Sequence, residues 1–583
     1  MYARPLGAHS LRLELSSLEA VARWRALVIE LVAAGLLAPP VDLVPGARTL
    51  LLDGVDPVAA AQLLAEHEQR ALPSTSAAAA GLAAPVRLAL PSTSAAEEDV
   101  VEVPVIYDGA DLAEVARIWQ MTERQVVARH TGTEFTVAFC GFAPGFPYLV
   151  GLGGQMPRRA TARPTVPAGS VGLAGSFCGI YPSASPGGWQ LLGRTDACLF
   201  DPDRTPPALL PPGTRVRFVE VAPGSPPLGP AARAARAEPG QPSAASPSAV
   251  GAGPDRDLSP SGWALLVVRP GALTTVQDAG RVGLAHLGVP RAGPLDSGAA
   301  KAANRLVGNL EDAAVLETTL TGAALRAAPV SCSTPPAAGR ILIAVTGAEA
   351  AASVAGRPVP RGVPVQVGAG ELLDIGPARR GVRSYLAVAG GIAVAPVLGS
   401  RSRDTLAGIG PAPLTVGARL PVGDLPKSAA ALQDAAATPP APHLQAGAAP
   451  PAAGTPAPSG PVRLRLTPGP HEEWFGPEGL ACLLSAPYAL SPHSNRIGAR
   501  LSGMPVPRRR AEELESEGMV LGAVQVPPDG QPVVLLADHP TTGGYPVIGV
   551  VDPRDLDGLA QVRPGAAVQF VPAAAGAGGE AHP

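Results

Sequence analysis

The chain has 583 residues, a formal net charge of −3 and only 16% charged residues, so it lacks the basic surface typical of proteins that bind nucleic acids or anionic membranes. Its five cysteines are scattered without a CxxC pair, which predicts neither a disulfide framework nor a metal site. We find no secretory signal and no uncharged apolar run long enough to span a membrane, and therefore expect a cytoplasmic protein.

Helical patterns occur at three places along the chain. Residues 18–34 carry apolar side chains at helical spacing, and residues 111–130 resemble two short helices. Thr122 and Gln125 stand three positions apart, as in a capping box, at the start of the second of these. A further helix is expected over 296–307, and most of the remaining sequence consists of short strands separated by Gly and Pro, typical of β-barrels or sandwiches.

Three segments rich in Pro, Ala, Gly and Ser interrupt these elements, at 71–98, 222–262 and 426–460. Such segments cannot bury enough apolar surface to order themselves, so we expect a disordered insertion and two disordered linkers. The domains expected between them are an N-terminal α/β part (1–125) and three barrels (126–221, 263–425 and 461–572).

Two distant segments share one pattern. Residues 187–196 and 543–552 both read Gly-Gly-aromatic, three residues, Gly, two residues, Asp, and each is followed by a similar Pro-Gly segment, at 212–219 and 564–571. Landmarks repeated in the same order predict that one barrel unit occurs at least twice.

Polar groups gather at four places where chemistry could take place. His130 precedes a loop rich in Gly and aromatic residues, and its position at a helix end suits either a cap or a proton-transfer group. Arg158 and Arg163 lie near the turn Gly169-Ser170, where guanidinium groups and backbone N–H groups could hold a carboxylate or phosphate. An exposed arginine-rich loop is the alternative interpretation.

The other two of these four clusters lie in the second half of the chain. One contains Gln277, Asp278 and Arg281, and the other contains Asn495, Arg496, Arg500, Asp538, His539, Thr541 and Thr542. Polar residues this dense in an apolar chain build either a site or a buried scaffold network, and both interpretations remain open.

Several common motifs are absent from the sequence. It contains no GxxxxGK[ST] phosphate loop, no GxGxxG after a strand, no HExxH and no lysine in a biotin-attachment setting. If ATP binds, its site is not marked by a short motif.

Longer segments resemble two known families. Residues 140–149, 166–171 and 186–195 resemble the carboxyltransferase family once called allophanate hydrolase subunit 1, and residues 275–317, 399–402, 494–501 and 541–546 resemble the companion subunit 2 family. The resemblance implies a fusion of the two, mainly β with α/β parts, that contains multiple cyclophilin-like barrels and a small N-terminal α/β domain.

The resemblance also implies a function. Members of these families include the B and C subunits of 5-oxoprolinase, which act with a separate A subunit to open 5-oxo-L-proline, a small-molecule substrate, to L-glutamate. It therefore implies an ATP-dependent hydrolase of a cyclic amide, with Mg-ATP as cofactor, the 5-oxoprolinase A subunit or a similar protein as partner, and no covalent biotin. A carboxyltransferase component of a urea-type carboxylase and a histidine-kinase inhibitor are the alternatives.

The family match suggests a role for each cluster. His130, or Asp538 with His539, would transfer protons, while Arg158, Arg163, Gly169 and Ser170 would hold anions. Gln277, Asp278, Arg281, Thr541 and Thr542 would bind substrate or phosphate, and Asn495, Arg496 and Arg500 would hold the substrate or an interface. Ala162 and Arg403 depart from the family pattern, in which Pro and Thr are common at these places.

Overall fold

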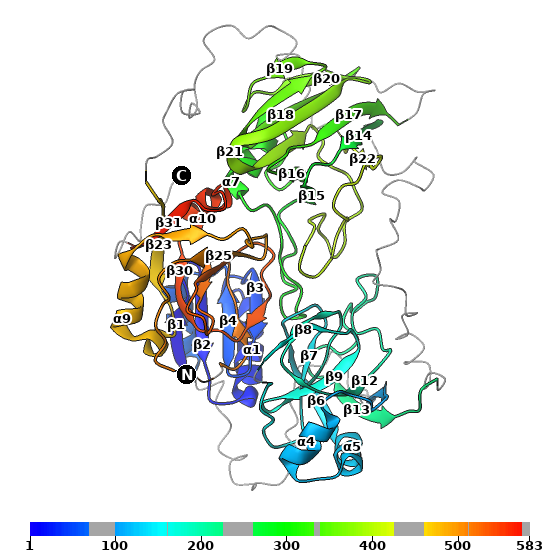
Figure 1. Ribbon diagram of the computed structural model, residues 1–583, viewed down its shortest axis with the longest axis vertical. Helices are drawn as coiled ribbons and strands as arrows, with labels where there is room; N and C mark the ends of the chain where they lie inside the picture. Colours follow the sequence, from blue (N-terminus) through cyan, green and yellow to red (C-terminus); the bar gives the residue numbers. More distant parts are fainter. Residues whose placement is uncertain are drawn as a thin grey trace.

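The computed structural model describes residues 1–68, 100–159, 161–224, 261–330, 339–424, 460–510, 512 and 514–573. The insertion predicted at 71–98 and nearly all of the linkers predicted at 222–262 and 426–460 lie outside these residues, so their disorder stays a prediction. Figure 1 shows four units built mainly of strands. We call residues 1–224 the first module and residues 261–573 the second module.

The first unit is a four-stranded antiparallel sheet in the order β1-β2-β4-β3, which we call the N-terminal sheet. Ser17 and Asp56 cap its two helices, and the apolar side of the predicted helix packs on one face of the sheet through Trp24 and Leu31. Its elements are β1 (Tyr2–Pro5), β2 (Ser10–Glu14), α1 (Leu18–Ala33), β3 (Asp42–Pro45), β4 (Thr49–Asp53) and α2 (Pro57–Glu66).

The second unit, the first barrel, is a seven-stranded sheet in the order β12-β9-β10-β7-β6-β13-β5. Ile106 and Arg194 exchange two backbone hydrogen bonds of 2.9 Å, which join its two ends. The predicted pair of helices and the Thr122–Gln125 capping box are confirmed. Its elements are β5 (Val101–Val105), α4 (Leu112–Trp119), α5 (Glu123–Thr131), β6 (Glu134–Cys140), β7 (Pro147–Val150), β9 (Ser170–Ala174), β10 (Phe177–Ile180), β12 (Gln190–Arg194) and β13 (Arg215–Glu220), with a separate hairpin of β8 (Arg163–Val166) and β11 (Ser185–Gly187).

The boundary expected at residue 125 is wrong. Strand β5 pairs in parallel with β13, and α4 and α5 contribute Val115 and Val126 to the core of the barrel. Residues 100–131 therefore belong to the first barrel, and the boundary lies between residues 68 and 100.

The third unit is a nine-stranded sheet dominated by the long strands β18 and β21. The pairing of its described strands leaves it open, where the sequence predicted a barrel over 263–425. The predicted helix at 296–307 is confirmed as α7, capped by Asp296. The elements are β14 (Trp263–Arg269), β15 (Leu273–Gln277), α7 (Ser297–Leu306), β16 (Val315–Thr319), β17 (Ala324–Pro329), β18 (Arg340–Val354), β19 (Arg357–Val359), β20 (Val365–Gly368), β21 (Leu372–Val388) and β22 (Arg419–Pro421).

The fourth unit, the C-terminal barrel, is closed in the order β23-β30-β27-β28-β25-β24-β31. Its helix α9 is broken at Gly476, where φ is 63°. The elements are β23 (Val462–Pro468), α9 (Glu472–Ser485), β24 (Tyr488–Leu490), β25 (Gly498–Ser502), β27 (Ala523–Gln525), β28 (Val533–Leu535), β30 (Val547–Val551), α10 (Pro553–Ala560) and β31 (Ala567–Pro572), with a hairpin of β26 (Glu517–Gly518) and β29 (Thr542–Gly543).

The two barrels have the same topology. In each, the strand before the helices pairs in parallel with the last strand of the unit, β5 with β13 and β23 with β31. The other strands follow in matching order, and the Gly-Gly segment of each unit begins at the end of the separate hairpin, at Gly187 and Gly543. The repeat predicted from the Gly-Gly-aromatic pattern is therefore confirmed.

The two modules interlock rather than lie apart. Figure 1 shows the N-terminal sheet against the C-terminal barrel, although the two are at opposite ends of the chain. The sheet face without helices supplies Val44 and Leu51 to an apolar cluster that includes Met519 and Val547 of the barrel. The first barrel also contacts the second module, through the Gly145 N–H to the Leu287 carbonyl at 2.9 Å. No helix among the described residues is both long and apolar enough to cross a membrane.

Candidate functional site

A cavity of about 630 Å³ lies where the N-terminal sheet meets both units of the second module. Its walls come from β3 and β4, from residues 277–304 with one side of α7, from residues 310–315, and from two loops of the C-terminal barrel. Its polar and charged lining residues are Asp42, Asp53, Gln277, Asp278, Arg291, Ser297, Lys301, Asn304, Glu311, Asp312, His539 and Thr541. Since its volume is in the range of small-molecule sites, we treat this cavity as the candidate site.

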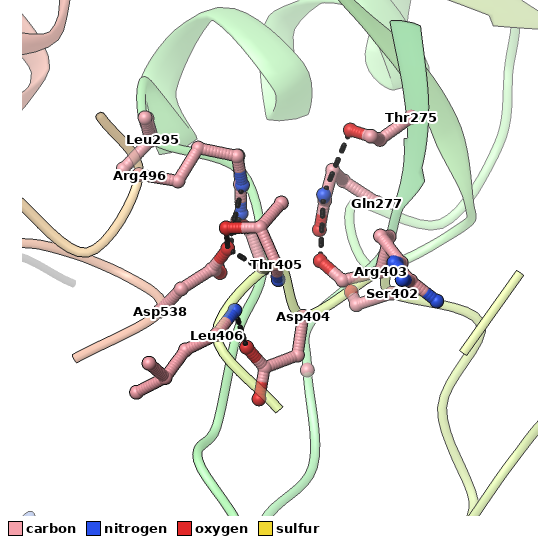
Figure 2. Close-up of polar contacts among 12 residues, drawn as sticks. Thr275, Gln277, Leu295, Ser402, Arg403, Asp404, Thr405, Leu406, Arg496 and Asp538 are labelled. Atoms are coloured by element: carbon pink, nitrogen blue, oxygen red, sulfur yellow. Dashed lines mark hydrogen bonds and ion pairs between the residues drawn. The ribbon is translucent and has the colours of Figure 1, made fainter. Parts of the chain in front are cut away.

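Gln277 and Asp278, both predicted site residues, line the cavity at the end of β15. The Gln277 amide donates to Thr275 Oγ1 at 2.9 Å and to the Arg403 carbonyl at 3.0 Å, which fixes its orientation (Figure 2). The Asp278 carboxylate accepts from Ser400 Oγ at 2.5 Å, Ser402 Oγ at 2.7 Å and the Arg401 N–H at 2.6 Å. The same carboxylate accepts the Gly280 N–H at 3.0 Å, so Asp278 ties its own turn to the 400–402 loop and shapes the cavity wall.

Arg281, another predicted ligand-binding residue, lies beneath the wall with an exposed fraction of 1%. Its Nε donates to the Val397 carbonyl at 3.2 Å and its Nη2 to the Ser402 carbonyl at 2.7 Å. Arg281 therefore fixes the same loop, and it is not among the residues that line the cavity.

Arg496 forms the centre of a buried ionic network (Figure 2). Its Nε and Nη2 donate to the two carboxylate oxygens of Asp538 at 3.0 and 2.9 Å, and its Nη1 donates to Glu317 at 2.5 Å. Its Nη2 also donates to the Gly293 carbonyl at 2.5 Å, and Glu317 accepts the Leu295 N–H at 2.9 Å. Because residues 293–295 border one cavity wall and Asp538 precedes another, the network holds the two walls together.

The two carboxylates of this network are both fully bonded. Burial opposes the charge of Glu317, yet the guanidinium groups of Arg496 and Arg383 lower the pKa of this carboxyl. Asp538 additionally accepts from the Thr405 N–H at 2.9 Å and from Thr405 Oγ1 at 2.6 Å. The predicted proton-transfer role of Asp538 does not suit this geometry, since Asp538 is fully buried and outside the cavity lining.

His539 and Thr541, both predicted site residues, line the cavity. His539 Nδ1 lies 2.8 Å from the Pro540 carbonyl, which can only accept, so Nδ1 carries the proton and Nε2 keeps a lone pair. Burial lowers the pKa of His539, which favours this neutral form. Within the described residues Thr541 Oγ1 has no hydrogen-bond partner, although the side chain is 3% exposed.

The anion site was expected at Arg158, Arg163, Gly169 and Ser170, but the first barrel uses the last three of these residues for its own contacts. Arg163 Nη2 pairs with Asp111 at 2.8 Å. The Gly169 N–H donates to the Tyr181 carbonyl at 2.7 Å and the Ser170 N–H to the Pro167 carbonyl at 3.3 Å. A Cβ on Gly169, whose φ is +78°, would lie 2.1 Å from the Thr195 carbonyl oxygen, so the glycine serves close backbone packing.

His130 is a core residue, which contradicts its expected catalytic role. Its exposed fraction is 0%, its Nδ1 lies 2.6 Å from the Tyr107 hydroxyl, and its ring stacks on Phe218 with centroids 4.3 Å apart. Burial lowers the pKa of His130 to about 3. A neutral imidazole enclosed by the first barrel can pack and accept a hydrogen bond, but it does not line the cavity.

The remaining predicted residues also lie outside the cavity lining. Asn495 accepts the Ile497 and Gly498 N–H groups in a turn, and Arg500 is exposed on β25. Thr542 Oγ1 accepts the Phe142 N–H at 2.8 Å and so joins the two modules. Arg158 is half-buried near Gly544, where an added Cβ would lie 3.7 Å from its Nη1.

Sequence reasoning missed several charged residues that line the cavity, above all Asp42 and Asp53. They lie directly opposite each other on β3 and β4, in the first module, while most of the cavity belongs to the second. Arg291 and Lys301 were also missed. No motif marks the positions of these four residues. Only the docking of the two modules brings the two aspartates and the two cations into one cavity.

Known proteins resemble both modules. Residues 1–210 match the family described as carboxyltransferase domain, subdomains C and D, and residues 287–572 match carboxyltransferase domain, subdomains A and B. The 5-oxoprolinase C subunit of Escherichia coli (strain K12) is 36% identical over 318 residues, which cover 53% of this chain and 90% of that protein. The 5-oxoprolinase B subunit of Escherichia coli O157:H7 is 54% identical over 128 residues, which cover 21% of this chain and 59% of that protein.

A solved structure aligns with almost the whole chain. The crystal structure of TTHA0988 is 36% identical in sequence, superposes with a TM-score of 0.74, and the alignment covers 98% of this chain and 100% of that one. Family matches over both modules, with a relative covered over most of its length, show that this chain belongs to the carboxyltransferase-domain family and joins counterparts of the B and C subunits of 5-oxoprolinase in one polypeptide.

Proposed function

We propose that this chain is the B and C component of an ATP-dependent 5-oxoprolinase, and that with a separate A subunit, it opens 5-oxo-L-proline to L-glutamate. The observation that carries the proposal is the cavity, because residues from the counterparts of both the B and the C subunits line it. A site that needs both modules explains why evolution would retain them together as one chain.

The chemistry of the cavity suits a small cyclic amide that carries a carboxylate. A lactam is a poor electrophile, and transfer of a phosphoryl group from Mg-ATP to its oxygen would turn that oxygen into a leaving group. Arg291 and Lys301, which line the cavity, are cations of the kind that bind carboxylate or phosphate. His539 Nε2 supplies a lone pair that can accept a proton there.

Reconstitution tests the proposal. The purified chain is mixed with the 5-oxoprolinase A subunit, Mg-ATP and 5-oxo-L-proline, and glutamate and ADP are measured, with each component omitted in turn. We expect both products at equal amounts only in the complete mixture. If the complete mixture of folded proteins produces no glutamate, the proposal is wrong.

A matched pair of variants on α7 tests the cavity itself. Lys301 and Arg305 both pair with Glu311, but only Lys301 lines the cavity. We expect Lys301→Ala to raise KM for 5-oxoproline or ATP about 10-fold or more, as for loss of a charged contact, and Arg305→Ala to leave KM unchanged. Equal effects of the two variants would remove the cavity from the proposal.

Carboxyl transfer is the second candidate, because both matched families are described as carboxyltransferase domains. It predicts turnover that depends on a separate carboxybiotin-bearing protein rather than on the 5-oxoprolinase A subunit. The same purified chain, supplied with carboxybiotin and urea, distinguishes the two functions. Inhibition of a histidine kinase without any turnover would favour the regulatory alternative instead.

A further inference from the structure

Asp42 reaches the cavity from the first module and is held there by the second. Its Oδ1 accepts the Gly283 N–H at 3.1 Å and the Ala285 N–H at 3.2 Å, across the boundary between the modules. Two backbone donors on one oxygen fix the carboxyl group in one orientation. The position of Asp42 therefore depends on the docking of the two modules.

The second carboxylate oxygen of Asp42 is left for a ligand. Asp42 lines the cavity and its exposed fraction is 6%, so the side chain is more than nine-tenths buried. Among the described residues, Oδ2 makes no hydrogen bond, since both bonds to this side chain end on Oδ1. A buried and oriented carboxyl group with one free oxygen is typical of acid–base residues.

Charged groups surround Asp42 on each element packed against it. Asp53 lies directly opposite on β4, and Arg291 and His539 line the same cavity from the second module. His286 Nδ1 lies 3.0 Å from the carbonyl of Gly283, in the turn that holds Oδ1, and the charge of Arg25 acts on His286. Burial and the Asp53 carboxylate raise the pKa of Asp42 to about 6, although the backbone N–H groups and Arg291 oppose the rise. Asp42 can therefore carry a proton near neutral pH.

We propose that Asp42, a residue of the module that corresponds to the B subunit, is the proton donor for ring opening in the cavity. This inference rests on the proposed function, and it makes the first module a direct participant in the chemistry. The residue is catalytic in the strict sense, since its Oδ2 would touch the reacting nitrogen.

The proton transfer takes place in the adduct that forms when water adds to the carbonyl carbon of the phosphorylated lactam, so this carbon carries a hydroxyl group, the phosphorylated oxygen and the ring nitrogen. The C–N bond breaks, its electron pair stays on nitrogen, and Asp42 Oδ2 gives its proton to form a new N–H bond. The hydroxyl oxygen of the adduct forms a C=O double bond and releases its proton to His539 Nε2, which leaves an acyl phosphate. A second water molecule hydrolyses this acyl phosphate to the carboxylate of glutamate and inorganic phosphate. Asp42 then regains a proton from solvent water and His539 loses one, which restores both groups.

Asp42→Asn tests the proposal with little change of shape. The asparagine Oδ1 can still accept from Gly283 and Ala285, but an amide replaces Oδ2 and cannot donate a proton to the leaving nitrogen as a carboxylic acid does. In the complete mixture with the A subunit, Mg-ATP and 5-oxoproline, we expect kcat to fall about 10²–10⁴-fold with little change in KM. Asp56→Asn, at the cap of α2 and outside the cavity lining, is the matched control and should keep the wild-type kcat.

Asp53→Asn gives a second measurement that leaves Asp42 in place. Removal of the Asp53 charge lowers the pKa of Asp42, and a proton donor must be protonated to act. The decline of kcat at high pH should therefore begin at a lower pH in Asp53→Asn than in the wild type. If the wild type is active and Asp42→Asn keeps its kcat, or if the pH profile of Asp53→Asn is unchanged, this inference is overturned while the proposed function stands. Absence of turnover in the wild type would instead overturn the proposed function.

Discussion

Arg496 and Asp538 face each other through two parallel hydrogen bonds, Nε to Oδ2 at 3.0 Å and Nη2 to Oδ1 at 2.9 Å, in the fully buried contact between the nine-stranded sheet and the C-terminal barrel. The pair is enclosed by Glu317 and the Gly293 carbonyl, so each donor of the guanidinium fork has an acceptor nearby. Such a fork fixes the direction of the Arg496 side chain as well as its distance from Asp538. The further bonds of Arg496 to Glu317 and Gly293 then fix the two cavity walls relative to each other.

Arg496→Ala should destabilise the second module strongly. Removal of one partner leaves Glu317 and Asp538 as uncompensated buried charges, which costs about 3–5 kcal/mol. Urea denaturation followed by tryptophan fluorescence measures the loss. Arg500→Ala, at an exposed position on β25, should change the free energy of unfolding by no more than about 0.5 kcal/mol. A similar small change in both variants would show that the network does not hold the walls.

Asp404→Asn should stabilise the protein more at high pH than at low pH. Asp404 Oδ1 accepts the Leu406 and Ala407 N–H groups, an arrangement that asparagine preserves. Burial and the nearby Asp538 carboxylate raise the pKa of Asp404 to about 7. In the unfolded chain an aspartate has a pKa near 4, so the folded state binds the extra proton between about pH 4 and 7 and loses stability as the pH rises through that window.

The urea midpoints of Asp404→Asn and wild type measure this difference at pH 4.5 and pH 8. We expect the gain of the variant at pH 8 to be on the order of 2–4 kcal/mol and to shrink towards pH 4.5. Asp108→Asn, at an exposed carboxylate, is the control and should show no such trend. A gain that does not depend on pH would contradict the buried, protonated state of Asp404.

Local signals in the sequence predicted secondary-structure elements, whereas contacts between the modules determine which residues form the candidate site. The capping box of Thr122 and Gln125 and the repeated Gly-Gly-aromatic segments depend on neighbouring residues, so they could be recognised directly. Asp42 could not, because its partners Gly283 and Ala285 lie in the other module. The N–H groups of Gly169 and Ser170 were expected to bind an anion, and only the fold of the first barrel shows that they donate to the Tyr181 and Pro167 carbonyls.

His130→Leu should leave turnover per folded molecule unchanged, because His130 lies in the core of the first barrel and away from the cavity. Its effect should appear in stability against pH. With a folded pKa of about 3 and an unfolded value near 6.5, the unfolded chain binds the extra proton, so the wild type loses stability as the pH falls below about 6.5. Between pH 6.5 and 5 this group accounts for about 2 kcal/mol. His130→Leu should lose less over that interval, and a loss of kcat at full folding would restore a catalytic role.

Arg12→Ala should weaken the docking of the two modules. The Arg12 side chain is 7% exposed and contacts Glu517 of the C-terminal barrel at 3.2 Å. Because His471 Nδ1 accepts the Val547 N–H, His471 Nε2 carries a proton and can donate to Glu517, 3.3 Å away. Loss of the Arg12 charge leaves the buried Glu517 with the neutral imidazole as its remaining partner among these groups, which costs several kcal/mol at an interface.

A protease site inserted within residues 225–260 allows the test: after cleavage, the wild-type modules should elute together in gel filtration at micromolar concentration, and those of Arg12→Ala should separate. Arg117→Ala, at an exposed pair on α4, should elute as the wild type does. Co-elution of the cleaved Arg12→Ala modules down to nanomolar concentration would show that the apolar contact around Val44 and Met519 is sufficient by itself.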